Sequence, residues 1–429
     1  MRIVAAALAG VMILPLASAP AAGDGVTTVL LVGDSVTQGS AGDWTWRYRL
    51  WKHFEASGTP VDFVGPRNDL WDREQMRPGS QDYVDPAFDT DHAAQWATAF
   101  VAQTYPISEL VGTYHPDVVV ESFGVNDFFG YWQPPAVVLA QAESFVAAAR
   151  SADPDVDVVL SRLPQTWLTG VPALNDGLPE LARSLDSPRS RVVVTATPEV
   201  VEFTDTYDPA HLSATGEVKV AAAMADALAE IGVGRPYPRP LPQVPNGPRL
   251  PATLTVSAKG RMADLSWTDP PGATGEYVWM RDASAREPWT RVAGPVEDRD
   301  SWRVKGLPKG HDHQFRLQAT KGTAVAEDVF SNTVRVRRPP PRIAAVRVTS
   351  KRRALRLRWW PKWQVARDVT YRVSWWPERR RGLVRLRMTN RPRTVIHNLR
   401  PGHSYRLRVS AVKAGVPGPG HTAVGITLG

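Results

Sequence analysis

The chain has 429 residues and contains no cysteine. This absence excludes disulfide bonds, thiolate metal sites and a cysteine nucleophile together. Beyond the N-terminal segment, no run is long and apolar enough for a membrane helix, which needs about 20 apolar residues. No convincing cluster of metal-binding residues is present in the N-terminal half either, where Asp91 and His92 are typical of a helix cap and a packing imidazole. We therefore expect no metal, no cofactor, and domains that are stabilised by core packing.

The first residues have the charged, apolar and small-residue regions of a secretory signal peptide. Arg2 is followed by an apolar run over residues 3–16 and by small residues over 17–22. The alternatives are a membrane anchor and a buried helix, but the apolar run is shorter than a spanning helix needs. The pattern predicts a signal peptide over residues 1–24 and a secreted protein, either extracellular or associated with the cell surface.

Residues 25–234 alternate short β-branched runs with longer amphipathic stretches. The expected strands are residues 27–32, 61–64, 117–122, 156–160 and 191–195. The expected helices are residues 44–56, 92–104, 136–151, 172–185 and 214–231. Strands that alternate with helices indicate a parallel sheet with helices on both faces. Ligands of such sheets bind beyond the carboxyl ends of the strands, so we expect the chemistry to lie just after each strand.

A proline-rich stretch ends this domain, and beyond it the periodicity changes to short alternating strands, which are typical of β-sandwiches. Residues 307–319 align with residues 399–411, so the two sandwiches are internal repeats. Both resemble fibronectin type III domains, in which a corner tyrosine precedes strand F; Tyr405 fits that corner, and His313 replaces it in the first repeat. The predicted organisation is a signal peptide (1–24), an α/β domain (25–234), a linker (235–251), a first sandwich (252–337), a short linker (338–342) and a second, basic sandwich (343–429).

Polar motifs follow the first, third and fifth predicted strands. Ser35 lies in GDSVTQG, where a serine hydroxyl would be exposed at a strand-to-helix turn, although Gly-Asp-Ser is also ordinary turn and cap chemistry. Asn126 lies in GVND and offers a neutral N–H donor for an oxyanion, although the motif also suits a turn. Asp208 precedes His211 by three residues, so its carboxylate can accept from the imidazole ring and fix the tautomer. Taken alone, His211 is more typical of a capping or packing histidine.

Together, these motifs supply a nucleophile, an oxyanion donor, a base and an orienting acid at one edge of the sheet. In order and spacing, GDS, GVND and DPAHLSATG resemble the blocks of the SGNH hydrolases, also called GDSL esterases and lipases. The resemblance implies a flavodoxin-like three-layer α/β/α fold, with Ser35 as nucleophile and Asp208 and His211 as its activating pair. It also implies an oxyanion hole formed by the Ser35 N–H, Asn126 and the N–H of Ala97, which aligns with a glycine of the family. Gly65, which also suits a turn at the end of the second strand, is the alternative for that glycine.

Aromatic residues near these motifs are candidates for substrate binding, and we assign Phe128, Trp132 and Trp167 to this role. An equally good alternative is that they pack against the following helix. The long polar segment over residues 66–90 is typical of a lid or a disordered loop. Neither feature identifies the substrate.

Charge is distributed very unevenly along the chain. Residues 343–429 contain twenty Lys and Arg and only two acids, a formal charge of +18; because the whole chain is +8, residues 1–342 carry −10. This basic module is a candidate for binding an anionic surface polymer, an acidic glycan or lipid headgroups, by charge and by stacking. The alternative is a solvated arginine-rich surface, and nucleic acid is not expected outside a cell. The residues considered are Arg352, Arg353, Arg379, Arg380, Arg381, Trp359, Trp360, Trp363, Trp375 and Trp376.

The sequence therefore predicts a secreted serine esterase that hydrolyses carboxylic esters through an acyl-enzyme on Ser35. Acyl groups on carbohydrates or small esters are the first substrate hypothesis, because secreted enzymes with accessory modules often act on polymers. A lipase acting on lipid esters is the alternative within the same chemistry. A non-catalytic protein that binds glycans or surfaces is the alternative of another class.

Overall fold

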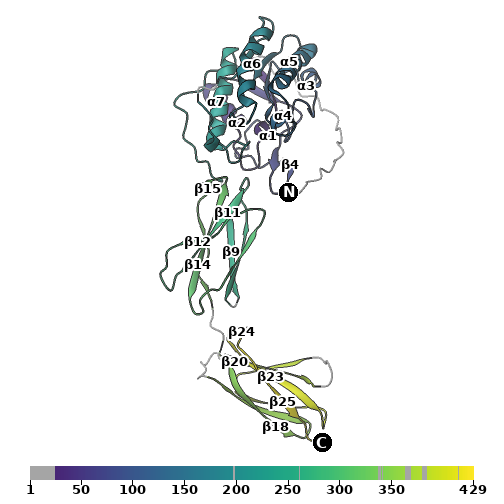
Figure 1. Cartoon of the computed structure of the whole chain (residues 1–429), viewed down its shortest axis with the longest axis vertical. Helices are drawn as coiled ribbons and strands as arrows, with labels where there is room; N and C mark the ends of the chain where they lie inside the picture. Colours follow the sequence, from purple (N-terminus) through teal and green to yellow (C-terminus); the bar gives the residue numbers. More distant parts are fainter. Residues whose placement is uncertain are drawn as a thin grey trace.

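The structure is a computed structural model that describes residues 25–196, 199–259, 261–336, 340, 342–362, 369–378, 384–413 and 415–429. An α/β domain is followed by two β-sandwiches along the long axis of the molecule (Figure 1). The predicted signal peptide lies outside the described residues, as do Trp363, Arg379, Arg380 and Arg381. Within the described parts of the chain, no helix has the length and apolar content needed to cross a membrane.

A parallel sheet forms the middle layer of the α/β domain. Its strand order is β2-β1-β6-β7-β8, and the short β5 also pairs with β1. All these pairings are parallel. The buried middle residues of β1 and β6 are Val and Leu, as expected where helices cover both faces of the sheet. Their bounds are β1 (Thr27–Gly33), β2 (Val61–Val64), β5 (Ala93–Ala94), β6 (Val118–Ser122), β7 (Asp157–Leu160) and β8 (Val192–Val194).

Helices pack on both faces of this sheet, in two separate hydrophobic clusters. On one face α2 (Trp46–Ser57) packs against α7 (Ala214–Glu230), and on the other α5 (Pro135–Ala152) packs against α3 (Ile107–Tyr114) and α6 (Val171–Leu185). Strand order and layers are those of a flavodoxin-like three-layer α/β/α fold, so the predicted fold class is confirmed. The short helices α1 (Ser35–Gln38), α4 (Val125–Phe129) and η1 (Phe203–Asp205) lie in the connections.

The helix predicted over residues 92–104 is wrong. This segment contains the short strand β5 and then turns, and the helix on this side of the sheet is α3, which the sequence did not predict. The reason lies in the backbone N–H groups of Phe100 and Val101, which donate to the Asp127 carboxylate at 2.9 and 3.3 Å. A side chain distant in sequence thus satisfies donors that a helix would have used.

Each sandwich has a three-stranded sheet that faces a larger one. In the first, β13-β10-β9 faces a sheet with β12, β11 and β14, around Trp267; in the second, β18-β19-β22 faces a sheet with β21, β20 and β23, around Trp359. The bounds in the first are β9 (Thr253–Lys259), β10 (Met262–Thr268), β11 (Gly275–Asp282), β12 (Thr290–Val296), β13 (Ser301–Lys305), β14 (Asp312–Lys321), β15 (Ala324–Val325), β16 (Val329–Phe330) and β17 (Val334–Arg335). Those in the second are β18 (Ile343–Lys351), β19 (Ala354–Pro361), β20 (Val369–Pro377), β21 (Arg385–Thr389), β22 (Arg393–Ile396), β23 (Ser404–Lys413), β24 (Val416–Pro417) and β25 (His421–Ile426).

Candidate active site

Ser35 is the first residue of α1, directly after the central strand β1. The Asp34 carboxylate accepts from the Val36 N–H at 2.9 Å and so caps this short helix. At its other end, the buried Arg47 guanidinium donates to the carbonyls of Thr37 (2.8 Å) and Gln38 (3.2 Å). The turn that carries Ser35 is therefore held at both ends by the side chains of Asp34 and Arg47, and Ser35 itself is only 5% exposed.

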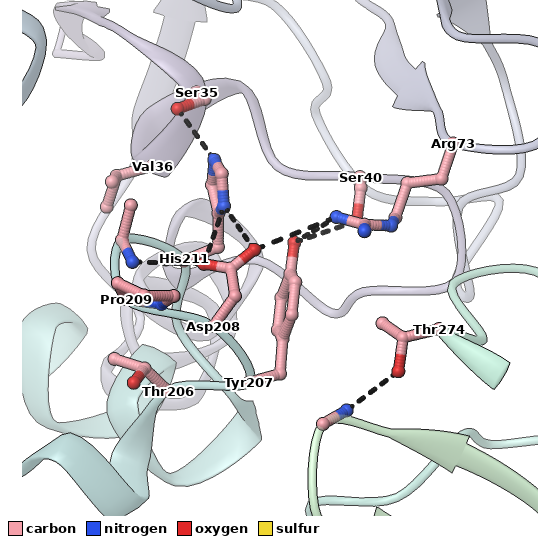
Figure 2. A network of polar contacts seen from close by, with 12 residues as sticks. Ser35, Val36, Ser40, Arg73, Thr206, Tyr207, Asp208, Pro209, His211 and Thr274 are labelled. Atoms are coloured by element: carbon pink, nitrogen blue, oxygen red, sulfur yellow. Dashed lines mark hydrogen bonds and ion pairs between the residues drawn. The ribbon is translucent and has the colours of Figure 1, made fainter. Parts of the chain in front are cut away.

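The loop before α7 brings a histidine and a carboxylate to this serine. The His211 Nε2 lies 2.9 Å from the Ser35 Oγ, and the His211 Nδ1 lies 2.9 Å from both oxygens of Asp208 (Figure 2). The Asp208 Oδ1 also accepts from the backbone N–H groups of Ala210 (3.0 Å) and His211 (2.8 Å). The structure thus brings together the three residues that the sequence assigned to nucleophile, base and orienting acid.

Electrostatics fix the direction of these hydrogen bonds. Burial of Asp208 opposes its ionisation, but hydrogen bonds from the His211 ring and from two backbone N–H groups outweigh burial and hold the pKa of Asp208 below its usual value. An ionised Asp208 can only accept, so the His211 Nδ1 must carry a proton and donate it. A neutral imidazole in this tautomer leaves Nε2 free to accept from the Ser35 hydroxyl.

Two aromatic rings lie nearly parallel to the His211 imidazole, and sequence reasoning assigned neither of them a role. Trp96 stacks at 4.4 Å between ring centroids, and Tyr207 at 5.7 Å. Trp71 in turn stacks on Trp96 at 5.0 Å between ring centroids, and the Arg73 guanidinium lies 3.9 Å from the Asp208 Oδ2. Trp96 directly precedes Ala97 in the chain, and Tyr207 directly precedes Asp208. This adjacency to predicted site residues is the sequence feature that could have identified both aromatic residues.

Trp167, predicted to bind substrate, contacts the loop of His211. Its indole N–H donates to the Pro209 carbonyl at 2.9 Å, and the Gln165 amide donates to the Ala210 carbonyl at 2.6 Å. The other two aromatic candidates lie in very different places. Phe128 is buried in the core, while Trp132 is 82% exposed. No contact of these residues identifies an acyl pocket, and their substrate-binding role stays a prediction.

Asn126 lies in α4, directly after β6 and therefore at the same sheet edge as Ser35. Its Nδ2 donates to the Thr98 carbonyl at 2.9 Å, which orients the amide and uses only one of its two hydrogens. The preceding Gly124 has φ +126°, and a Cβ there would approach Leu163 to 2.9 Å, so the turn needs a glycine. The same bond fixes the orientation of the second amide N–H of Asn126.

Ala97 is exposed and follows β5, which is bonded to the carboxyl end of β1. Its φ of +64° lies in the left-handed region, which favours glycine and costs an alanine roughly 1 kcal/mol. This conformation is consistent with a position that is glycine in the SGNH family. The oxyanion role of its N–H stays a prediction.

We expect Asn126→Ala to lower kcat for ester hydrolysis by about 10²- to 10³-fold, because one oxyanion donor is removed. KM should change little, since that donor acts on the charge that develops in the transition state. Steady-state kinetics on a small soluble ester measure both constants. Asn68→Ala, an exposed asparagine on the same domain, is the matched control. A change in KM alone would make Asn126 a substrate-binding residue.

Two buried carboxyl groups near Ser35 make stability depend on pH. Burial raises the pKa of Glu121 in β6 to about 8 and that of Asp34 to about 7. Because the folded protein holds these protons more tightly than the unfolded chain, the free energy of unfolding should fall between about pH 5 and pH 8, by at most about 1.4 kcal/mol per pH unit for each group. Urea unfolding followed by helical circular dichroism measures this slope. Glu121→Gln should flatten it, and an equal slope in that variant would contradict the assignment.

The described residues contain no group of three or more His, Asp or Glu side chains that could hold a metal ion. His92 is fully buried, with its Nε2 2.9 Å from the Asp69 carbonyl and its Nδ1 accepting from the Ala94 N–H at 3.0 Å. Burial, with Arg47 nearby, lowers the pKa of His92 well below its ordinary value. This neutral imidazole has a packing role, as the sequence interpretation proposed.

Residues 338–424 match the family model of the fibronectin type III domain. The second sandwich is a fibronectin type III domain.

No curated protein matches the chain. Among solved structures, a family 3 carbohydrate esterase from Talaromyces cellulolyticus is 23% identical with a TM-score of 0.43, over 48% of this chain and 98% of its own. A family 3 carbohydrate esterase from Clostridium thermocellum is 21% identical with a TM-score of 0.40, over 48% of this chain and 96% of its own. The first three fibronectin domains of chicken CNTN1 are 17% identical with a TM-score of 0.34, over 42% of this chain and 67% of their own.

The fibronectin type III domain has the tyrosine corner that its sequence predicted. The Tyr405 hydroxyl accepts from the Arg400 N–H at 3.0 Å. In the first sandwich the His313 Nε2 lies 3.5 Å from the Pro308 carbonyl, which is a poorer substitute for that hydrogen bond. Trp359, considered for ligand binding, is buried in the core of the fibronectin type III domain and cannot stack on a ligand.

Proposed function

We propose that this protein is a serine esterase that hydrolyses carboxylic esters through an acyl-enzyme on Ser35. The observation that carries the proposal is the continuous hydrogen-bonded chain from the Ser35 Oγ through the His211 ring to Asp208, with 2.9 Å at each step. A capping or packing histidine would not need this alignment. The likeness of the motifs to SGNH hydrolases supports the same chemistry.

In the proposed mechanism, the Ser35 oxygen attacks the ester carbonyl while its proton passes to the His211 Nε2. The ionised Asp208 stabilises the imidazolium that forms. The negative charge on the carbonyl oxygen is held by the Ser35 N–H, the second amide N–H of Asn126 and the Ala97 N–H. His211 then protonates the leaving alcohol, and a water molecule activated by the same imidazole releases the acid.

Short acyl groups are the favoured substrates. We place acyl groups on carbohydrates, or small esters, before lipid esters, because an esterase that carries two β-sandwiches as accessory modules is suited to polymeric substrates. We also expect the enzyme to act outside the cell.

An acyl-chain series tests this order. Turnover of p-nitrophenyl acetate should exceed that of the octanoate and palmitate esters, and acetate should be released from an acetylated polysaccharide. Ser35→Ala protein in the same assays controls for spontaneous hydrolysis. Faster turnover of the long-chain esters would favour the lipase alternative. The absence of turnover on every ester would favour a non-catalytic binding protein.

We also propose that the basic second sandwich binds an anionic surface polymer. On the outer face of its larger sheet, Arg406 of β23 lies between Trp376 of β20 and Val424 of β25. The next exposed position along β23 is Arg408, which lies between Ser374 and Thr422, so this face carries two cations with apolar side chains beside one of them. Such a face can combine attraction to a polyanion with apolar contact.

Removing residues 343–429 should leave turnover of small soluble esters unchanged while weakening binding to anionic surfaces, because the +18 charge is lost. Binding of the full chain should also weaken steeply as salt rises, since exposed charges are screened over about 8 Å at physiological ionic strength. Co-sedimentation of both forms with cell walls across a salt series measures this. Equal binding by the two forms would show that the basic face is only a solvated surface.

A further inference from the structure

The first sandwich contacts the α/β domain beside the catalytic loop, through the tip that follows β14. Lys321, the last residue of β14, is only 6% exposed and forms an ion pair with Asp43, which is also buried. Its Nζ lies 4.7 Å from the centroid of the Tyr207 ring. A lysine of one domain is therefore enclosed by residues of another.

The ion pair with Asp43 stabilises the buried charge of Lys321. Burial lowers the pKa of the Lys321 ammonium, and a buried cation is stable only beside a carboxylate. Asp43 is itself tied to the active-site domain, because its other oxygen accepts from the Ser40 N–H (3.1 Å) and from the Ser40 hydroxyl (2.9 Å). The Ser40 hydroxyl in turn lies 3.5 Å from the Tyr207 hydroxyl. The ion pair thus belongs to a polar network that reaches Tyr207. From the Tyr207 hydroxyl the network continues through Arg73 to Asp208 (Figure 2).

The backbone of the same tip lies directly against Tyr207. Gly322 has φ +58°, and a Cβ at this position would lie 2.5 Å from the Tyr207 carbonyl oxygen. The Gly322 N–H donates to the Thr274 hydroxyl at 2.9 Å, so a second loop of the sandwich holds the tip in place (Figure 2). That second loop also contacts the α/β domain, since a Cβ on Gly272 would lie 2.6 Å from the Ala41 carbonyl oxygen.

Tyr207 connects this contact to the chemistry. Its backbone N–H donates to the His211 carbonyl at 3.0 Å, its ring stacks on the imidazole, and its neighbour in the chain is Asp208. Asp43, Tyr207, His211 and Ser35 line the same small cavity. A shift of Tyr207 would therefore move the base and its orienting acid together.

We propose that the first sandwich is part of the catalytic unit, and that Lys321 and Gly322 are positioning residues that hold Tyr207, and through it His211, in the reactive geometry. This inference rests on the proposed esterase function. It separates the roles of the two sandwiches, because the first contacts the α/β domain beside its triad, whereas the second carries the basic surface. Misplacement of a catalytic group by about 1 Å can cost up to about 10²-fold in rate.

The test uses full-length protein and p-nitrophenyl acetate, a substrate too small to need an accessory binding module. Lys321→Met and Gly322→Val should each lower kcat by about tenfold or more, with little change in KM, at a temperature at which circular dichroism shows folded protein. Lys305→Met removes an exposed lysine of the same sandwich and should match the wild type. The double variant Asp43→Asn/Lys321→Met leaves no unpaired buried charge, so it should recover part of the kcat lost in Lys321→Met.

Wild-type kcat in both Lys321→Met and Gly322→Val would overturn the inference, even if their melting temperatures fell. A loss of activity that only follows the unfolded fraction would overturn it as well. Wild-type protein that hydrolyses no ester would overturn the proposed function together with this inference. Active wild type with equally active variants would overturn this inference alone.

Discussion

Ser35→Ala should lower kcat for ester hydrolysis by about 10⁴-fold or more, because members of a catalytic triad act as a unit. Without the hydroxyl no acyl-enzyme can form, and His211 has no nucleophile to activate. The oxyanion donors remain in this variant, so a residual rate above the uncatalysed reaction is expected. The measurement is the turnover of p-nitrophenyl acetate, with protein concentration fixed and the blank rate subtracted.

The variant should stay folded, because Ser35 is held in its turn by Asp34 and Arg47 through bonds that do not involve its hydroxyl. Ser144→Ala is the matched control, since Ser144 is an exposed serine on α5 and alanine favours helices. It should retain wild-type activity. Near-wild-type activity in Ser35→Ala would end the esterase proposal as stated here.

Asp208→Asn should slow the reaction by a similar factor, about 10⁴-fold, while leaving the fold intact. The remaining carbonyl oxygen can still accept from the backbone N–H groups of Ala210 and His211, so the loop should keep its shape. An asparagine N–H facing Nδ1 would instead favour a proton on Nε2, and that tautomer cannot accept the proton of Ser35. Kinetics and thermal unfolding of the same preparation separate these two effects.

Asp155→Asn is the control for Asp208→Asn, because Asp155 is an exposed aspartate whose ion pair with Arg189 lies on the surface. Surface ion pairs contribute about 1 kcal/mol at most, so this variant should match the wild type in both rate and stability. If Asp208→Asn kept the wild-type rate, another acid would have to orient His211. In that case Asp208 would have no part in the reaction, and its role would be to pair with Arg73, 3.9 Å away.

Much of the α/β fold could be predicted from local pattern alone. The predicted strand at residues 61–64 coincides with β2, and the predicted helix at 172–185 differs from α6 by one residue. The helix is long enough for its apolar residues to show the helical period, and the strand is a short, mainly apolar run. The segment over residues 92–104 was mistaken for a helix because its apolar residues have helical spacing, whereas Asp127, more than twenty residues later, takes up its backbone donors.

The residues of the candidate site also fall into two groups, those that a local sequence motif identifies and those that only tertiary packing brings to the site. Ser35, Asn126, Asp208 and His211 could be found because each lies in a short motif just after a strand, and parallel strands bring their carboxyl ends to one edge. Trp96 and Arg73 carry no such local signal, whereas Tyr207 is the neighbour of Asp208 in the chain. Trp96 and Arg73 come from separate connections, and only the packing of those connections brings them next to His211 or Asp208.

The sequence by itself determined the order of the elements, the chemical types of the groups at the sheet edge and the charge of each module, because these follow from local periodicity and composition. Only the tertiary structure decided which side chains hold those groups in place. The contact of Lys321 with Asp43 joins residues 278 positions apart in the chain. No local pattern encodes such a pair, because its stability comes from burial that exists only after both domains have folded against each other.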